Sequence, residues 1–163
     1  MTRTSWIAIS CTAVILFFAI VMAIATAAVP HTKHDARCDH AYAEHAYDDA
    51  IDYCGLASLE YGAQAARSTT SLQRRENLFY EAACMYQVSM AYFNRDDQDI
   101  HNAILYANRS FALLEPIVNE AVFKIGHKDP TKVYSKRELS LLVTMAMLMG
   151  SIRQTFPEVG NGT

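Results

Sequence analysis

The chain has 163 residues, with 14 Lys and Arg against 17 Asp and Glu, and its formal net charge is −3 at pH 7. This length accommodates one domain, and hydrophobic residues make up 52% of it, so a core can form. A mildly acidic chain whose longest basic run is the pair Arg74 and Arg75 argues against nucleic acid as a partner.

The N-terminal segment has the features of an export signal. Arg3 is its only charge, and residues 6–29 are apolar or small apart from a few Ser, Thr and Cys. Residues 25–27 (Ala-Thr-Ala) match the small-x-small pattern of signal cleavage, and Pro30 interrupts any helix that follows. The apolar stretch is also long enough to span a bilayer, which takes roughly 20 residues. We expect residues 1–28 to be a signal peptide or a transmembrane anchor.

The position of the N-terminal charge predicts where the remainder of the chain lies. Because positive charge stays on the near side of the membrane, residues 31–163 are expected on the far side, in a periplasm, a lumen or the exterior. If the segment is retained, residues 5–28 would contact the membrane. Residues 29–35 are expected to be a linker.

A pair of helices is predicted over residues 36–66, which are rich in Ala, Leu, Tyr and Asp and contain no proline. Asp48 and Asp49 suit the first turn of the second helix, because acidic side chains interact favourably with the positive end of a helix dipole. Residues 68–71 (Ser-Thr-Thr-Ser) predict a linker that ends in an N-cap for the next helix.

Two longer helices follow. Apolar positions recur at helical spacing over residues 72–94, and residues 94–97 (Asn-Arg-Asp-Asp) predict a turn. The next helix carries an apolar stripe that begins at Ile100. Pro116 must kink this helix or begin a new one, because proline removes a backbone donor and clashes with the preceding turn. Gly126 is expected to end it.

The C-terminal part begins with a loop at residues 127–130. Ser135 and Glu138 form a capping-box pattern directly before the apolar run 139–152. This run is too short to span a membrane, so we expect a helix packed deep in the bundle. Residues 157–163 are expected to be a flexible tail.

The alternation of apolar and polar residues that marks a strand is found nowhere in the chain, so the sequence predicts an all-α fold. The helical domain is placed at residues 36–156. It is expected to consist of antiparallel helical hairpins, as an irregular bundle or a repeat, preceded by the N-terminal hydrophobic helix.

Two pairs of predicted helices share a pattern of small residues, with spacings of 12 and then 7. Tyr47 precedes the second helix of the first pair, and Gly62 and Pro116 stand where a helix-breaking residue is expected. The pattern resembles that of the tetratricopeptide repeat family, which packs two antiparallel helices through small residues at this spacing. The matching residues are Cys38, Ala50 and Ala57 in the first pair, and Ala91, Ala103 and Ser110 in the second.

The resemblance implies a concave surface that binds a peptide or a partner helix, with contact residues that the sequence does not assign. We see no Gly-rich phosphate loop, no pair of carboxylates in a setting that raises a pKa and no nucleophile elbow. The leading interpretation is therefore a non-enzymatic scaffold that binds another protein or peptide, without a cofactor.

The alternative interpretation is a metal-binding protein, suggested by a His- and Cys-rich segment at residues 31–45. On a helix, His34, Cys38 and His45 would share one stripe. Imidazole and thiolate groups in such an arrangement can chelate zinc or copper. The competing explanation is a solvated or partly packed helix face.

Three cysteines lie beyond the N-terminal segment, and an exported location permits disulfides. Cys38 and Cys54 are expected on adjacent helices of one hairpin, where a bridge closing a loop of roughly 15 residues would contribute about 3 kcal/mol. Cys84 would then be an unpaired thiol, buried in its helix and inert.

Nine tyrosines are an unusually large number for this length. Tyrosine is amphipathic and common at interfaces. The rings are expected either to fill gaps between helices or to line a groove.

Overall fold

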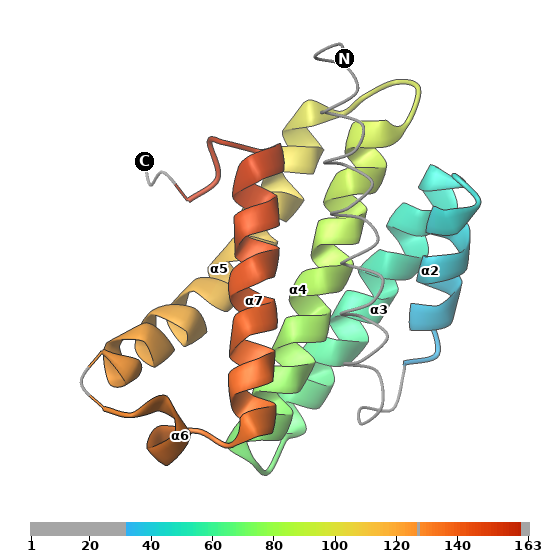
Figure 1. Ribbon diagram of the computed structural model, residues 1–163. Coiled ribbons are helices and arrows are strands. Elements are labelled where there is room, and N and C mark those ends of the chain that lie inside the picture. Colours follow the sequence, from blue (N-terminus) through green and yellow to red (C-terminus); the bar gives the residue numbers. More distant parts are fainter. Residues whose placement is uncertain (1–31, 127, 161–163) are drawn as a thin grey trace, which may run out of the picture. The chain divides into compact units, whose positions relative to one another are not determined.

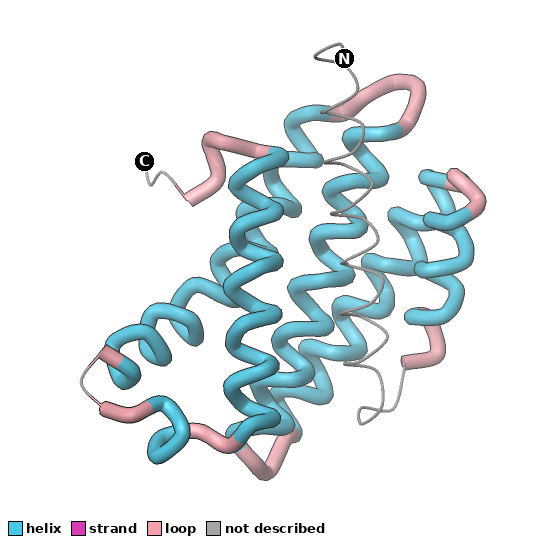
Figure 2. Tube along the Cα trace, viewed as in Figure 1, coloured by secondary structure: helices cyan, strands magenta, loops and turns pink. Residues whose placement is uncertain are grey.

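The computed structural model describes residues 32–126 and 128–160, and every regular element among them is a helix (Figures 1 and 2). The all-α prediction is thereby confirmed, whereas the signal or anchor predicted at residues 1–28 lies outside the described residues. The helices are α2 (Asp35–Ala43), α3 (Tyr47–Arg67), α4 (Ser71–Asn94), α5 (Ile100–Ile125), α6 (Pro130–Val133) and α7 (Lys136–Thr155).

Helix α4 is the centre of the described domain. It packs against α3 and α5 and also contacts α7, while α2 packs on α3 and α7 on α5 (Figure 1). The connections at 44–46, 68–70 and 95–99 are short, which makes successive helices antiparallel neighbours. Successive helices from α2 to α5 therefore pack against one another in pairs.

Side-chain caps set the starts of several helices. Thr70 accepts a hydrogen bond from the Gln73 amide, and Asp99 accepts one from the Asn102 amide. At α7 the predicted capping box is present: the Glu138 amide donates to Ser135 Oγ, and the Ser135 amide donates to the Glu138 carboxylate. Each cap satisfies backbone donors that have no partner inside the helix.

Replacing Ser135 with alanine is expected to lower the free energy of unfolding by about 1 kcal/mol, because two reciprocal bonds are lost. Chemical denaturation followed by circular dichroism measures this change. The control is Ser140→Ala, an exposed position in the interior of the same helix. Alanine is the better helix former there, so we expect no loss, and equal losses in the two variants would contradict the capping role.

The six small residues of the repeat-like pattern are all fully buried where helices cross. Across the α4–α5 crossing, Ser89 Oγ donates to the Ala103 carbonyl at 2.6 Å and Ser110 Oγ donates to the Ala82 carbonyl at 2.7 Å. These bonds require the two backbones to approach closely, which only small side chains permit.

Pro116 lies inside α5, which continues across it to Ile125. Of the two outcomes expected at this proline, a second helix is therefore wrong. The proline removes the helical donor for the Ala112 carbonyl, and Ala112 is exposed, so water can replace that donor. Beyond this point the C-terminal part of α5 runs away from α7 (Figure 1).

Several expected boundaries differ from those observed. The packed chain extends past residue 156, since Val159 is fully buried, so the expected tail at 157–163 begins too early. Asp35, placed in the linker at 29–35, belongs to α2, and Thr32 is also buried. The one-turn helix α6 within residues 130–133 was not expected.

Helix α7 buries one side only. Met145, Leu148 and Ile152 are buried, but Val143 on the other side is 58% exposed. The prediction that this helix lies deep in the bundle is therefore wrong for its outer face. Within residues 32–126 and 128–160, no helix has the length and apolar character needed to cross a membrane.

Candidate functional site

A disulfide between Cys38 and Cys54 joins α2 to α3, with an S–S distance of 2.10 Å and a Cα–Cα distance of 4.7 Å. The predicted pairing is therefore confirmed. The two cysteines belong to a buried cluster of small residues that also contains Ala41, Ala50, Val88 and Ala91. The candidate site is built around this buried cluster.

Five half-buried tyrosines pack around that cluster, and we call them the tyrosine face: Tyr42, Tyr47, Tyr53, Tyr92 and Tyr106. The Tyr92 and Tyr106 rings stack with centroids 5.8 Å apart, and Tyr42 meets Tyr47 edge to face at 6.1 Å. Because the side chains beneath them are small, the rings cover the core and still reach the surface.

Polar neighbours hold several of these rings. Asn94 Nδ2 donates to the Tyr42 hydroxyl at 3.3 Å, and His45 Nδ1 lies 2.9 Å from the Tyr47 hydroxyl. The Arg37 guanidinium lies 5.6 Å from the centroid of the Tyr53 ring. The tyrosine face is therefore fixed by side chains from α2, the following turn and α4.

Exposed carboxylates lie on or next to the elements that carry these tyrosines. They come from the first turns of α3 and from the loop between α4 and α5: Asp48, Asp49, Asp52, Asp96 and Asp97. Arg95 pairs with Asp97 at 2.7 Å and lies 3.4 Å from Asp48, which ties that loop to α3. Burial raises the pKa of Tyr92, and nearby Tyr106, Asp99 and Asp52 act in the same direction.

The helical stripe expected for metal binding does not form. Helix α2 ends at Ala43, and His45 lies in the following turn with φ of 59°, so it is not on the helix face of His34 and Cys38. The Cys38 sulfur is held in the disulfide and is not a thiolate ligand. His34 Nδ1 instead lies 2.8 Å from Glu60 Oε1.

Within the described ranges, no three His, Cys, Asp or Glu side chains are grouped so that they could hold a metal ion. Burial is the largest single influence on Glu60 and acts to raise its pKa, but hydrogen bonds with His34 and Thr32 and the electrostatic interaction with His34 together outweigh burial, so the pKa of Glu60 is lowered. The His34–Glu60 pair thus joins the start of α2 to α3.

Cys84 is a free, buried thiol on α4. Its sulfur donates to Asp35 Oδ1 at 3.9 Å. Burial raises the pKa of the Cys84 thiol, and the carboxylates of Asp35, Asp39 and Glu81 raise it further. A thiol that is kept protonated and covered is a poor nucleophile, in agreement with the inert role expected from the sequence.

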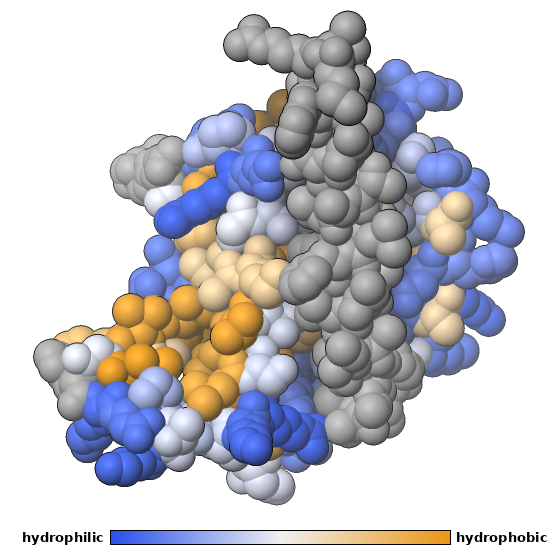
Figure 3. Space-filling model, in the orientation of Figure 1, coloured by the Kyte–Doolittle hydropathy of each residue, from blue (hydrophilic) through white to orange (hydrophobic). Residues whose placement is uncertain are grey.

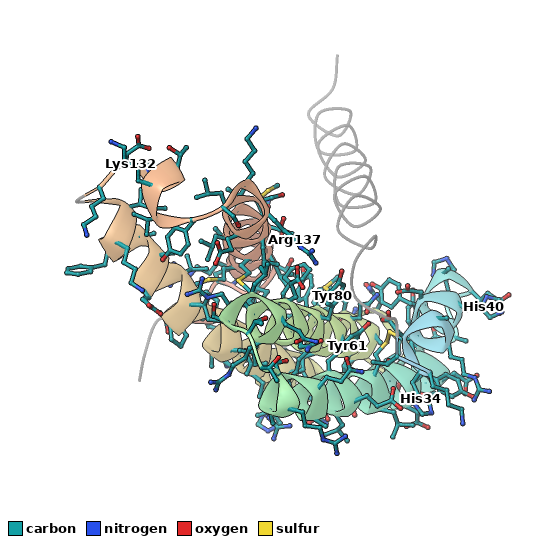
Figure 4. All side chains as sticks on the ribbon, turned by 90° about the horizontal axis from the view of Figure 1, so that it is seen from below. His34, His40, Tyr61, Tyr80, Lys132 and Arg137 are labelled. Carbon is teal, nitrogen blue, oxygen red and sulfur yellow. A yellow bond between two sulfur atoms is a disulfide. The ribbon has the colours of Figure 1, made fainter. Side chains whose placement is uncertain are left out.

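Figure 4 places Tyr61 and Tyr80 between α3 and α4, whereas His40 lies on α2 and points outward. Tyr61 and Tyr80 stack with centroids 5.1 Å apart, and the Tyr61 hydroxyl donates to Asp35 at 2.8 Å. These two rings are core residues, so the nine tyrosines serve both purposes considered above: some fill gaps and some lie at the surface.

The sequence did not predict which of the tyrosines would lie together at the surface. One signal was present: Tyr47 and Tyr92 lie at nearly equal chain distances on either side of the loop 68–70. Two helices of similar length that are joined by a short loop bring such positions together. The remaining members required the packing of α2 and α5 as well.

Comparisons with protein families, with curated proteins and with solved structures found no match to this chain.

Proposed function

We propose that the chain is a non-enzymatic scaffold, exported or membrane-tethered, that binds a protein or peptide through the tyrosine face. The observation that carries this proposal is that five half-buried tyrosines pack against one buried cluster, which contains the Cys38–Cys54 disulfide. Tyrosine supplies a large contact area with few rotatable bonds, which is why it is enriched in binding surfaces.

The buried cluster beneath the tyrosine rings is rigid, and this rigidity supports binding. The rings rest on fully buried Cys38, Cys54, Ala50 and Ala91, and the disulfide fixes α2 against α3. A surface that is already ordered loses little conformational entropy when a partner arrives, so more of the contact energy appears as affinity.

The chemistry of the rim favours a basic partner segment. Asp49 and Asp52 are exposed on α3, the helix that carries Tyr47 and Tyr53, and Arg95 is engaged by Asp97 and Asp48. Lysine or arginine side chains on the partner would be attracted to this rim and could also lie over the tyrosine rings.

The relation to tetratricopeptide repeats is part of the proposal. It is supported by the complete burial of the six small residues at the helix crossings and by the hairpin arrangement of α2 with α3 and α4 with α5. An exported location is supported by the disulfide, because such bonds persist in oxidising compartments, and by the apolar N-terminal sequence.

Reversing the charge of the rim tests the proposal. The native chain, the variant Asp49→Lys/Asp52→Lys and a control with two reversals elsewhere, Glu120→Lys/Glu158→Lys, are crosslinked in intact host cells. Captured material is identified by mass spectrometry. We expect one partner at near-stoichiometric yield with the native chain and the control, and a yield about tenfold lower with the rim variant.

Two outcomes of this experiment would contradict the proposal. The same yield from all three chains would place the partner on another surface, and the lack of any stoichiometric partner of the native chain would remove the scaffold function. All four positions are exposed, so none of the substitutions is expected to disturb the core.

A further inference from the structure

Two large apolar side chains are exposed side by side near the C-terminal end of α5. Val122 is 64% exposed and Phe123 is 71% exposed, although Ala121 beside them is buried. In Figure 3, hydrophobic residues gather over the C-terminal part of α5 and the neighbouring part of α7, and hydrophilic residues border them. Isolated exposed apolar residues are ordinary, but an adjacent pair within a larger patch indicates a contact surface.

Lysines follow this apolar pair along the chain. Lys124, at the end of α5, is joined by exposed Lys128, Lys132 and Lys136 around α6 and the start of α7. Residues 118–137 contain five Lys and Arg but only two acids, in a chain whose net charge is negative. We call Val122, Phe123, Lys128, Lys132 and Lys136 the basic tip.

The two acids of this segment already have other partners. Glu120 pairs with Lys124, and Asp129 caps α6 by accepting from the Thr131 amide. Lys128, Lys132 and Lys136 form no ion pair with any described residue. Their charges are therefore available to an anionic surface.

The kind of cation distinguishes between possible partners. The nearby arginines are engaged within the fold, since Arg137 pairs with Glu76 at 2.6 Å and Arg75 lies 3.8 Å from Glu138. The cations that remain are lysines, which are depleted at protein–protein interfaces. A lysine can instead rest its apolar stem on the acyl boundary of a bilayer while its ammonium group stays among the headgroups.

We propose that the basic tip docks on a bilayer surface that contains anionic phospholipids. Phe123 and Val122 enter the boundary between headgroups and acyl chains, and the three lysines contact the lipid phosphates. Figure 4 places Lys132 and His40 at opposite ends of the domain, and His40 lies on α2, the helix that carries Tyr42. Docking would therefore leave the tyrosine face directed away from the lipid.

The test uses the full 163-residue chain, whose single tryptophan, Trp6, is replaced by phenylalanine. Phe123→Trp then reports on the basic tip. Leu59→Trp is the matched control, because Leu59 is 69% exposed on α3. Each protein is reconstituted in vesicles of phosphatidylcholine with or without phosphatidylglycerol, and quenching by brominated acyl chains measures the depth of the indole.

We expect blue-shifted, strongly quenched emission from Phe123→Trp in the anionic vesicles and little quenching of Leu59→Trp. Replacing Lys128, Lys132 and Lys136 with glutamine should shift the equilibrium towards the undocked state by roughly fivefold per lysine, and on the order of 100-fold together. Raising the salt concentration should act in the same direction.

Three outcomes would overturn the proposal. One is quenching at position 123 no stronger than at position 59. Another is quenching that persists in pure phosphatidylcholine and in the glutamine variant, which would exclude recognition of anionic lipid. The third is a blue shift that grows with protein concentration in lipid-free detergent solution, because the tip would then be covered by a second copy of the chain.

Discussion

Reduction of the Cys38–Cys54 disulfide is expected to lower the free energy of unfolding by about 3 kcal/mol, since the bond closes a short loop in the unfolded chain. The loss should fall first on α2. This helix has only nine residues, and a helix of that length is not stable alone in water. Release of α2 would also remove Tyr42 from the tyrosine face, so reduction should weaken partner binding together with stability.

Denaturant unfolding with and without a reductant measures the effect in three chains. The native chain and Cys84→Ala should both lose stability on reduction, whereas Cys38→Ala/Cys54→Ala should not respond. Hydrogen exchange should show faster exchange of the α2 amides in the reduced native chain, before those of α4. If reduction leaves the free energy of unfolding of the native chain unchanged, the disulfide does not stabilise the domain. The inference that the tyrosine face rests on a rigid cluster would then be contradicted as well.

The helices could be predicted because local chemistry marks their ends. The linker at 68–71 and the capping box at Ser135 each provide a side chain that bonds to backbone amides at a helix start. The turn after Asn94 was also predicted, but not that Asp99 caps the helix that follows it. Such signals need no knowledge of the tertiary fold. The same holds for the small residues at the helix crossings, because their spacing alone indicated close packing.

The features that were missed depend on contacts between distant segments. Val159 is fully buried after the end of α7, and Gly160, with φ of 75°, lies so close to the Phe111 ring that a Cβ there would clash with it. The end of α2 was not predicted because the turn there uses His45, a non-glycine residue with positive φ, so no glycine marked it. Extending that helix produced the expectation of a metal-binding stripe.

The tyrosine face and the basic tip could not be predicted either, because both depend on contacts between distant segments. Composition showed that tyrosines were numerous and that the chain was acidic overall, but only the packing separates surface rings from core rings. Lysines spaced four apart at 128, 132 and 136 were visible in the sequence, but no local signal predicted that they would share a surface. The fold gathers acids at one end and lysines at the other.

Asp35→Ala is expected to lower the free energy of unfolding by about 3 kcal/mol, which is the second large effect that we predict. Asp35 is buried in the first turn of α2, where it accepts hydrogen bonds from the Tyr61 hydroxyl and the Cys84 thiol. Its removal leaves both donors buried without that acceptor and takes a negative charge from the start of a helix. One carboxylate thus connects α2, α3 and α4.

A double-mutant cycle isolates the central bond. Tyr61→Phe alone should cost about 2 kcal/mol, because the buried carboxylate loses a donor, and Asp35→Ala/Tyr61→Phe should cost at least 1 kcal/mol less than the sum of the single changes. Burial and the hydrogen bond to Asp35 both raise the pKa of Tyr61, so the hydroxyl stays protonated as a donor throughout the accessible pH range.

Tyr134→Phe is the matched control for that cycle. The Tyr134 hydroxyl is also buried, but it has no hydrogen-bond partner among the described residues. Its removal should leave the free energy of unfolding unchanged or raise it slightly, since an unsatisfied polar group is removed. If Tyr61→Phe and Tyr134→Phe change the free energy of unfolding equally, the hydrogen bond between Tyr61 and Asp35 does not stabilise the fold. The attachment of α2, and with it the Tyr42 edge of the tyrosine face, would then depend on the disulfide and apolar packing.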